Sequence, residues 1–163
     1  MEDQRLEARV GAALARRGWT LCAAESCTGG LLMHRLTNVP GSSAYVTGGV
    51  VTYSYEAKER LLGVRPETLA AHGAVSPETA AEMVRGVLDL FAGDVGISIT
   101  GIAGPGGGLP GKPVGLTYIG IAIPRLELFR IDRYVWSGTR EQIKTSSAEA
   151  AMLKVLEALK EED

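Results

Sequence analysis

Residues 19–36 read Trp-Thr-Leu-Cys-Ala-Ala-Glu-Ser-Cys-Thr-Gly-Gly-Leu-Leu-Met-His-Arg-Leu, and this stretch decides the fold. Its first six residues form a short apolar run of the kind found in buried strands. Small and polar residues follow over positions 25–30. Apolar residues then return at helical spacing at Leu31, Leu32 and Leu36. The segment therefore predicts a strand, a tight turn and a helix, in that order.

The flanking sequence predicts further helices and strands. Upstream, residues 6–17 have the pattern of an amphipathic helix that ends at Gly18. Downstream, residues 44–53 are rich in β-branched and aromatic side chains, as in a strand, and residues 55–62 predict a short helix ended by Gly63. Ser76-Pro77-Glu78 has the features of a helix start, with serine as the N-cap and proline in the first helical position.

The second half of the chain predicts a hairpin between a loop and a long helix. The expected elements are a buried strand over residues 94–100, a glycine- and proline-rich loop over 101–115, and adjacent strands over 114–123 and 126–136 that turn at Pro124-Arg125. The last helix begins at Thr139, with Gln142 completing a capping box. Helices and strands that alternate before a late hairpin predict a three-layer α/β/α sandwich with a mixed sheet, formed by residues 1–163 as a single domain.

Composition limits the classes of protein to consider. The chain has 163 residues, of which 45% are hydrophobic and 22% charged, and its net charge is −2. These values suit a globular domain and give no electrostatic case for a nucleic-acid-binding protein. No run approaches the roughly 18 apolar residues of a membrane span, and the charged N-terminus does not resemble a signal peptide. We therefore expect a cytoplasmic protein without nucleic-acid or membrane partners, with Cys22 and Cys27 reduced.

Ser26 is a candidate nucleophile because it lies between a strand end and a helix start. The unpaired N–H groups of a helix N-terminus can hold the oxyanion of a tetrahedral intermediate or a bound anion. The simpler interpretation is that Ser26 or Thr28 caps the helix, and the local pattern alone favours it. The motif lacks the Gly-x-Ser-x-Gly form of the α/β-hydrolase nucleophile elbow.

A nucleophilic serine needs a base, and the sequence offers few. His34 lies about 12 Å from Ser26 along the same predicted helix, too far for a hydrogen bond. His72 lies in a predicted loop. A lysine with a lowered pKa is the other route, and Lys58 follows the strand that ends at Tyr53. The side chains of Lys58 and Tyr53 can both reach Ser26 if the end of this strand lies beside the end of the strand that precedes Ser26. The commoner interpretation of Lys58 is a solvent-exposed helix lysine.

Residues 100–115 form a glycine-rich segment that partly imitates a phosphate-binding P-loop. Gly106, Gly111 and Lys112 have the spacing of that motif. Pro113 stands where serine or threonine binds magnesium, and a strand follows where a P-loop requires a helix. These differences argue against nucleoside triphosphate hydrolysis. The segment either shapes a ligand pocket or connects two strands as a mobile loop.

Arg140 lies in the first turn of a predicted helix, where a positive charge opposes the helix dipole. Binding of a phosphate or carboxylate explains such an arginine, and the alternative is an exposed side chain paired with Glu141 or Gln142. The two distant histidines and the two cysteines lack zinc-ligand spacing, so we expect no metal and no other cofactor. Cys27 is either a rival nucleophile or a small apolar core residue.

Together these segments resemble the CinA C-terminal domain family, which includes bacterial nicotinamide mononucleotide deamidases of the PncC type. The matching segments are residues 24–30, 40–43, 51–54 with Lys58, 69–76, 98–105, 112–115 and 137–140. The chain resembles the stand-alone form, because full-length CinA proteins carry an additional N-terminal domain similar to molybdopterin-binding proteins. Gly106 stands where the family often has an acidic residue.

The resemblance implies hydrolysis of the carboxamide of nicotinamide mononucleotide to nicotinic acid mononucleotide and ammonia. It implies Ser26 as nucleophile, Lys58 as base and Tyr53 as an orienting or relaying group, in place of the simpler interpretations above. The N–H groups around residues 27–29 are the expected oxyanion hole. The expected substrate-binding residues are Cys27, Thr28, Gly29, Thr100, Gly101, Gly104 and Arg140. A homodimer or higher homo-oligomer is also expected. Two alternatives stay open: a non-catalytic nucleotide- or partner-binding module, and a hydrolase that uses Cys27.

Overall fold

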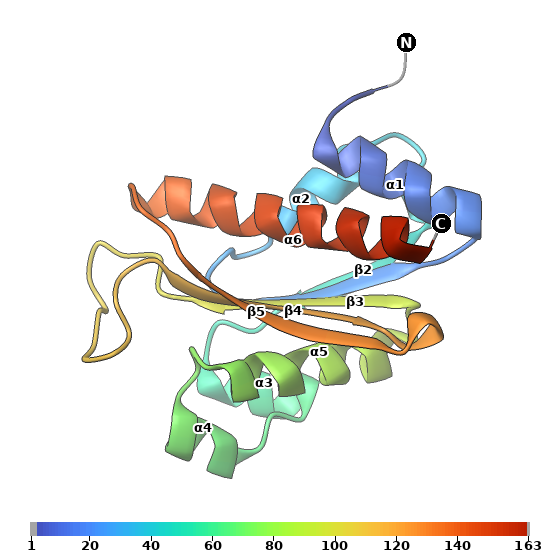
Figure 1. Ribbon diagram of the computed structural model, residues 1–163. Coiled ribbons are helices and arrows are strands. Elements are labelled where there is room, and N and C mark those ends of the chain that lie inside the picture. Colours follow the sequence, from blue (N-terminus) through green and yellow to red (C-terminus); the bar gives the residue numbers. More distant parts are fainter. Residues whose placement is uncertain (1–2, 163) are drawn as a thin grey trace.

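A five-stranded mixed sheet forms the centre of the molecule in the computed structural model, which describes residues 3–162 (Figure 1). The strand order is β2-β1-β3-β4-β5. The parallel strands are β1 (Leu21–Glu25), β2 (Val46–Val51) and β3 (Val95–Gly101), and the antiparallel ones are β4 (Leu116–Ile123) and β5 (Leu128–Val135). One face is covered by α1 (Leu6–Arg17), α2 (Leu31–Thr37) and α6 (Arg140–Glu162), and the other by α3 (Tyr55–Leu62), α4 (Pro66–His72) and α5 (Pro77–Phe91). The predicted three-layer α/β/α sandwich with a mixed sheet is confirmed.

Strand β1 is buried along its whole length because helices cover both faces of the sheet. Leu21 and Ala23 pack into the core beneath α1, α2 and α6. Cys22 and Ala24 pack on the opposite side, into the cluster that includes α5 residues Met83 and Val87. Because the side chains on both faces of this strand are buried, apolar and polar residues do not alternate along it. This explains the continuous apolar run in the sequence.

The helix starts predicted from the sequence are confirmed by their hydrogen bonds. Ser76 Oγ accepts from the Thr79 N–H at 3.1 Å, as an N-cap does. At the start of α6, the Thr139 N–H donates to Gln142 Oε1 at 2.9 Å, and the Gln142 N–H donates to Thr139 Oγ1 at 3.2 Å. This reciprocal capping box fixes the first turn of α6 and therefore the position of Arg140.

The structure differs from the prediction at His72 and at several strand ends. Strand β2 covers Val46–Val51 and not 44–53, and β5 covers Leu128–Val135 and not 126–136. His72 does not lie in a loop, because it is the last residue of α4, a helix that the sequence reading missed. Pro66 in its first turn is a helix-start signal, but seven residues are too few to show a clear apolar period. Strand β4 begins at Leu116 and not at residue 114, because Gly115 has a φ of 92° that interrupts the extended backbone.

The carboxyl ends of the parallel strands lie at one edge of the sheet. Glu25 at the end of β1 pairs with Val51 of β2 on one side and with Ile99 of β3 on the other. The chain leaves β1 toward α2 on one face and enters β3 from α5 on the other. In open α/β sheets, the crevice outside such strand ends is the usual ligand site.

Candidate active site

Ser26 directly follows β1 at this edge. Its N–H donates to the carbonyl of Ile99 at 2.9 Å, which extends the β1–β3 ladder by one residue and fixes the backbone at the turn. The residue is buried, with 8% of its surface exposed. Ser26 is therefore held in a defined position where the first strand turns toward α2.

Glu25 caps α2, and this leaves Ser26 out of the capping role. The Glu25 carboxylate accepts from the N–H groups of Leu32 and Met33 at 3.0 and 3.1 Å and from the Thr28 hydroxyl at 2.6 Å. The helix has no other side-chain cap. The sequence reading missed this residue, although a carboxylate that ends a buried strand before a helix was a usable signal. The interpretation of Ser26 or Thr28 as the cap is wrong.

Lys58 reaches Ser26 from α3. The Ser54 side chain accepts from the Ala57 N–H at 3.0 Å and so starts the helix. The Lys58 side chain is 1% exposed, and its Nζ lies 3.0 Å from Ser26 Oγ and donates to the Thr52 carbonyl at 2.7 Å. The alternative interpretation of Lys58 as a solvent-exposed helix lysine is wrong.

The surroundings of Lys58 destabilise its ammonium form. Burial lowers the pKa of Lys58 from 10.5 to about 8. Within residues 3–162, the hydrogen bonds of its Nζ go to a hydroxyl and a carbonyl, and no carboxylate stabilises the ammonium form. A neutral amine that contacts a serine hydroxyl at 3.0 Å can accept its proton.

Tyr53 and Arg140 lie together at the mouth of the site. Arg140 donates from one guanidinium nitrogen to the Tyr53 hydroxyl at 2.8 Å and from the other to the Gly104 carbonyl at 2.7 Å. Tyr53 is 60% exposed. In the described part of the chain, its hydroxyl contacts Arg140 and makes no hydrogen bond to Ser26 or Lys58. The pairing of Arg140 with Glu141 or Gln142 is not found.

A cavity of about 160 Å³ joins most of the predicted residues. The predicted residues that line it are Ser26, Cys27, Tyr53, Lys58, Thr100, Gly101 and Arg140. Ala74, Val75 and Ala103 complete the lining and were not predicted, because their small apolar side chains carry no chemical signal in a sequence. The Thr100 hydroxyl donates to the Ala74 carbonyl at 2.7 Å and holds the segment after α4 against the site.

The other predicted residues support the site without lining the cavity. Thr28 donates to Glu25, and the Gly104 carbonyl accepts from Arg140. The Gly29 N–H donates to the Ser26 carbonyl at 3.1 Å, so it is already used. Among the hydrogen bonds that join different residues within 3–162, none uses the N–H of Cys27 or of Thr28. Of the predicted N–H groups of residues 27–29, these two can still bind an oxyanion.

Cys27 is poorly suited to act as the nucleophile. It is 5% exposed, and burial raises the pKa of its thiol to about 11. Its sulfur packs so close to Gly101 that a Cβ at that glycine would lie 3.2 Å away. A reactive cysteine needs a lowered pKa, so this thiol has the character of a packed core residue.

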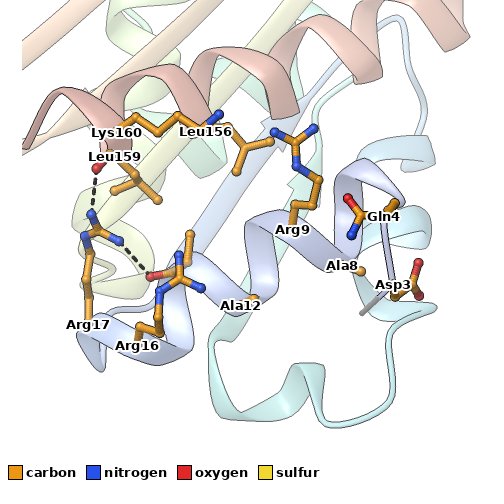
Figure 2. Close-up of a pocket in the computed structure, with 11 residues that line it drawn as sticks. Asp3, Gln4, Ala8, Arg9, Ala12, Arg16, Arg17, Leu156, Leu159 and Lys160 are labelled. Atoms are coloured by element: carbon orange, nitrogen blue, oxygen red, sulfur yellow. Dashed lines mark hydrogen bonds between the residues drawn. The ribbon is translucent and has the colours of Figure 1, made fainter. Parts of the chain in front are cut away.

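A larger groove of about 390 Å³ lies between α1 and α6, away from these residues (Figure 2). Its cationic residues are Arg9, Arg16, Arg17 and Lys160, and Arg17 donates to the carbonyls of Ala13 and Leu159. The side chains that line the groove include no serine, threonine or cysteine. Within residues 3–162, a lysine amine and a serine hydroxyl form a hydrogen bond only at the smaller cavity.

No group of three or more His, Cys, Asp or Glu side chains in residues 3–162 is arranged to hold a metal ion. No helix within the same range is long and apolar enough to cross a membrane.

Comparison with known proteins identifies the family. Residues 3–159 match the model of the CinA C-terminal domain. A CinA-like protein from Chloroherpeton thalassium is 61% identical over 120 residues, which are 74% of this chain and 29% of that protein. The chain spans 38% of the length of another CinA-like protein, from Chlorobaculum tepidum, which is 52% identical over 96% of this chain. The crystal structure of a CinA superfamily protein from Klebsiella pneumoniae is 40% identical, covers 96% of both chains and superposes with a TM-score of 0.91. The chain therefore belongs to the CinA C-terminal domain family.

Proposed function

We propose that the chain is an amidohydrolase that converts nicotinamide mononucleotide to nicotinic acid mononucleotide and ammonia, with Ser26 as nucleophile and Lys58 as base. The observation that carries the proposal is the contact of 3.0 Å between Lys58 Nζ and Ser26 Oγ, made inside the protein without a carboxylate partner for the lysine. The identity of the substrate rests on the family resemblance. The proposed setting is a cytoplasmic homo-oligomer that takes part in pyridine nucleotide recycling.

The first half of the reaction forms an acyl-enzyme. Lys58 accepts the hydroxyl proton as Ser26 Oγ bonds to the carboxamide carbon, and the carbonyl oxygen becomes an oxyanion. The N–H groups of Cys27 and Thr28 donate to that oxygen. The Lys58 ammonium then gives its proton to the amide nitrogen, the carbon–nitrogen bond breaks and ammonia leaves.

The second half repeats the proton transfers with water. Lys58 takes a proton from a water molecule as its oxygen bonds to the acyl carbon. The bond between Ser26 Oγ and that carbon breaks, Ser26 recovers its proton from Lys58, and the nicotinic acid product is released. Tyr53 and Arg140, which are joined at the mouth of the cavity, are positioned to contact the substrate beyond the reacting carbon.

An ammonia-release assay with nicotinamide mononucleotide, without added metal, tests the proposal. We expect turnover by the unmodified protein, a loss of at least about 1,000-fold in Ser26→Ala and a strong loss in Lys58→Ala. Cys27→Ala should stay within about threefold, because a buried thiol with a raised pKa takes no part in the chemistry. Thermal stabilisation by the nucleotide without ammonia release would instead favour the non-catalytic binding module. Loss of activity in Cys27→Ala alone would favour the cysteine hydrolase.

A further inference from the structure

The catalytic cavity is too small for a whole nucleotide. Its volume is about 160 Å³, whereas sites for small organic ligands usually measure roughly 300–1,000 Å³. A second pocket of about 420 Å³ is lined by Leu31, Arg140, Glu141, Lys144 and Thr145. Arg140 lines both pockets, so they adjoin at this side chain. A ligand whose reacting group occupies the first pocket can extend past Arg140 into the second.

Lys144 is a cation in this second pocket that forms no ion pair within residues 3–162. It lies one helical turn after Arg140 on α6, a spacing that puts both side chains on the same face. The side chain is half-buried, and in the described part of the chain it makes neither an ion pair nor a hydrogen bond. Partial burial removes water from the ammonium group, and no hydrogen bond or ion pair replaces that hydration. This favours binding of an anion from solution.

The position of Lys144 connects it to the turn that carries Ser26. A Cβ at Gly29 would lie 3.7 Å from Lys144 Nζ, so the ammonium lies close to the backbone of that turn. Its charge also acts on the Cys27 thiol, where it counteracts part of the rise in pKa caused by burial. Glu141 lines the same pocket and opposes an anion, but it is exposed, so water and salt screen its charge.

We propose that the second pocket receives the phosphate of the substrate and that Lys144 is the residue that binds it, which makes Lys144 a determinant of specificity for the nucleotide over the nucleoside. The inference rests on the proposed function for the choice of ligand. Arg140 already donates to Tyr53 and Gly104 and joins the two pockets, whereas Lys144 has all of its donors available. The pocket thereby separates recognition of the phosphate from the chemistry at Ser26.

The test compares the binding of two ligands that differ by the phosphate alone. Titration calorimetry would measure nicotinamide mononucleotide and nicotinamide riboside on Ser26→Ala, which should bind without turnover, and on the same protein carrying Lys144→Gln. We expect the Kd for the mononucleotide to rise about tenfold or more and the Kd for the riboside to change by less than about twofold. Lys144→Arg should keep most of the affinity for the mononucleotide.

Lys154→Gln is the matched control, because it removes one positive charge from the same helix about 15 Å further along. It should leave both Kd values unchanged. Equal weakening of both ligands by Lys144→Gln, an unchanged Kd for the mononucleotide, or absence of mononucleotide binding would overturn the inference. Ammonia release by the unmodified protein decides the proposed function separately. If the protein binds the mononucleotide through Lys144 but releases no ammonia, the phosphate site is supported and the proposed enzymatic function is contradicted.

Discussion

At the scale of single residues, the protein keeps a lysine in an environment that opposes its charge. Lys58 is 1% exposed, and burial lowers its pKa to about 8. The folded state therefore releases the proton at a lower pH than the unfolded chain, where the pKa is near 10.5. The unfavourable effect on stability is complete below pH 8 and disappears as the pH rises toward 10.5. A buried lysine that does not stabilise the fold at neutral pH agrees with the proposed role of Lys58 as a base.

Replacement of Lys58 by methionine makes this effect measurable. Between pH 7 and pH 10, the free energy of unfolding of the unmodified protein should rise by about 2–3 kcal/mol relative to that of Lys58→Met. The reason is that the unfolded chain binds more protons than the folded one over this interval. Urea unfolding of both proteins at each pH checks the prediction. Parallel stability curves over the interval would mean that Lys58 titrates normally in the folded protein.

At the scale of secondary-structure elements, two short helices determine the relative positions of the reacting groups. α2 is fixed by the Glu25 carboxylate, and α3 is fixed by its contact with α5. That contact occurs at Gly86, where a Cβ would lie 2.0 Å from the Leu62 carbonyl oxygen at the end of α3. The position of Lys58 relative to Ser26 thus depends on a residue that has no side chain and no role in the chemistry.

Glu25→Gln tests the cap. The amide oxygen of glutamine can replace one of the two carboxylate oxygens as an acceptor. The negative charge that strengthens the hydrogen bonds with the N–H groups at the start of α2 is lost. We expect a loss of about 1–3 kcal/mol in the free energy of unfolding, together with reduced ammonia release, since the turn at Ser26 loses its support. Chemical denaturation measures the first effect. Glu56→Gln on the exposed surface of α3 is the control and should change stability by less than about 0.5 kcal/mol. Equal effects of the two substitutions would contradict the role of Glu25.

Gly86→Ala tests the contact between α3 and α5. In an exposed helix, replacement of glycine by alanine stabilises by roughly 1 kcal/mol. Here the added methyl group collides with the Leu62 backbone, so we expect a lower Tm and lower activity as α3 moves away from α5. Asp89→Ala, at an exposed position of the same helix, serves for comparison and should not reduce activity. A more stable Gly86→Ala protein with full activity would rule out the proposed packing.

At the scale of the whole molecule, the fold was predictable and the side-chain connections within the site were not. The buried run before Ser26, the capping residues Ser76 and Thr139, and the late hairpin led to the correct layers because each is a local pattern. The contact of Lys58 with Ser26 depends on two strand ends lying side by side, which the sequence allowed without requiring. The family resemblance led to this pair.

The features that the sequence did not reveal depend on distant contacts. Arg140 bonds to the hydroxyl of Tyr53, 87 positions earlier in the chain, so no local spacing links them. The local sequence places Glu25 in a polar turn. Its burial could not be predicted, because it depends on the helices that pack on both faces of the sheet. Lys144 carries no motif and stands out once the volumes of the two pockets are known. Predictions from the sequence were therefore strongest for elements and weakest for hydrogen bonds that join them.

The pH dependence of kcat/KM for ammonia release from nicotinamide mononucleotide tests the central claim, that a neutral lysine amine activates Ser26. Below the Lys58 pKa of about 8, the rate should fall nearly tenfold for each pH unit, because the ammonium form cannot accept the serine proton. Above that pH the rate should level off, and Ser26→Ala should show no such curve. A rate that is constant between pH 6.5 and 9.5, or one that depends on a group with a pKa near that of histidine, would contradict the account.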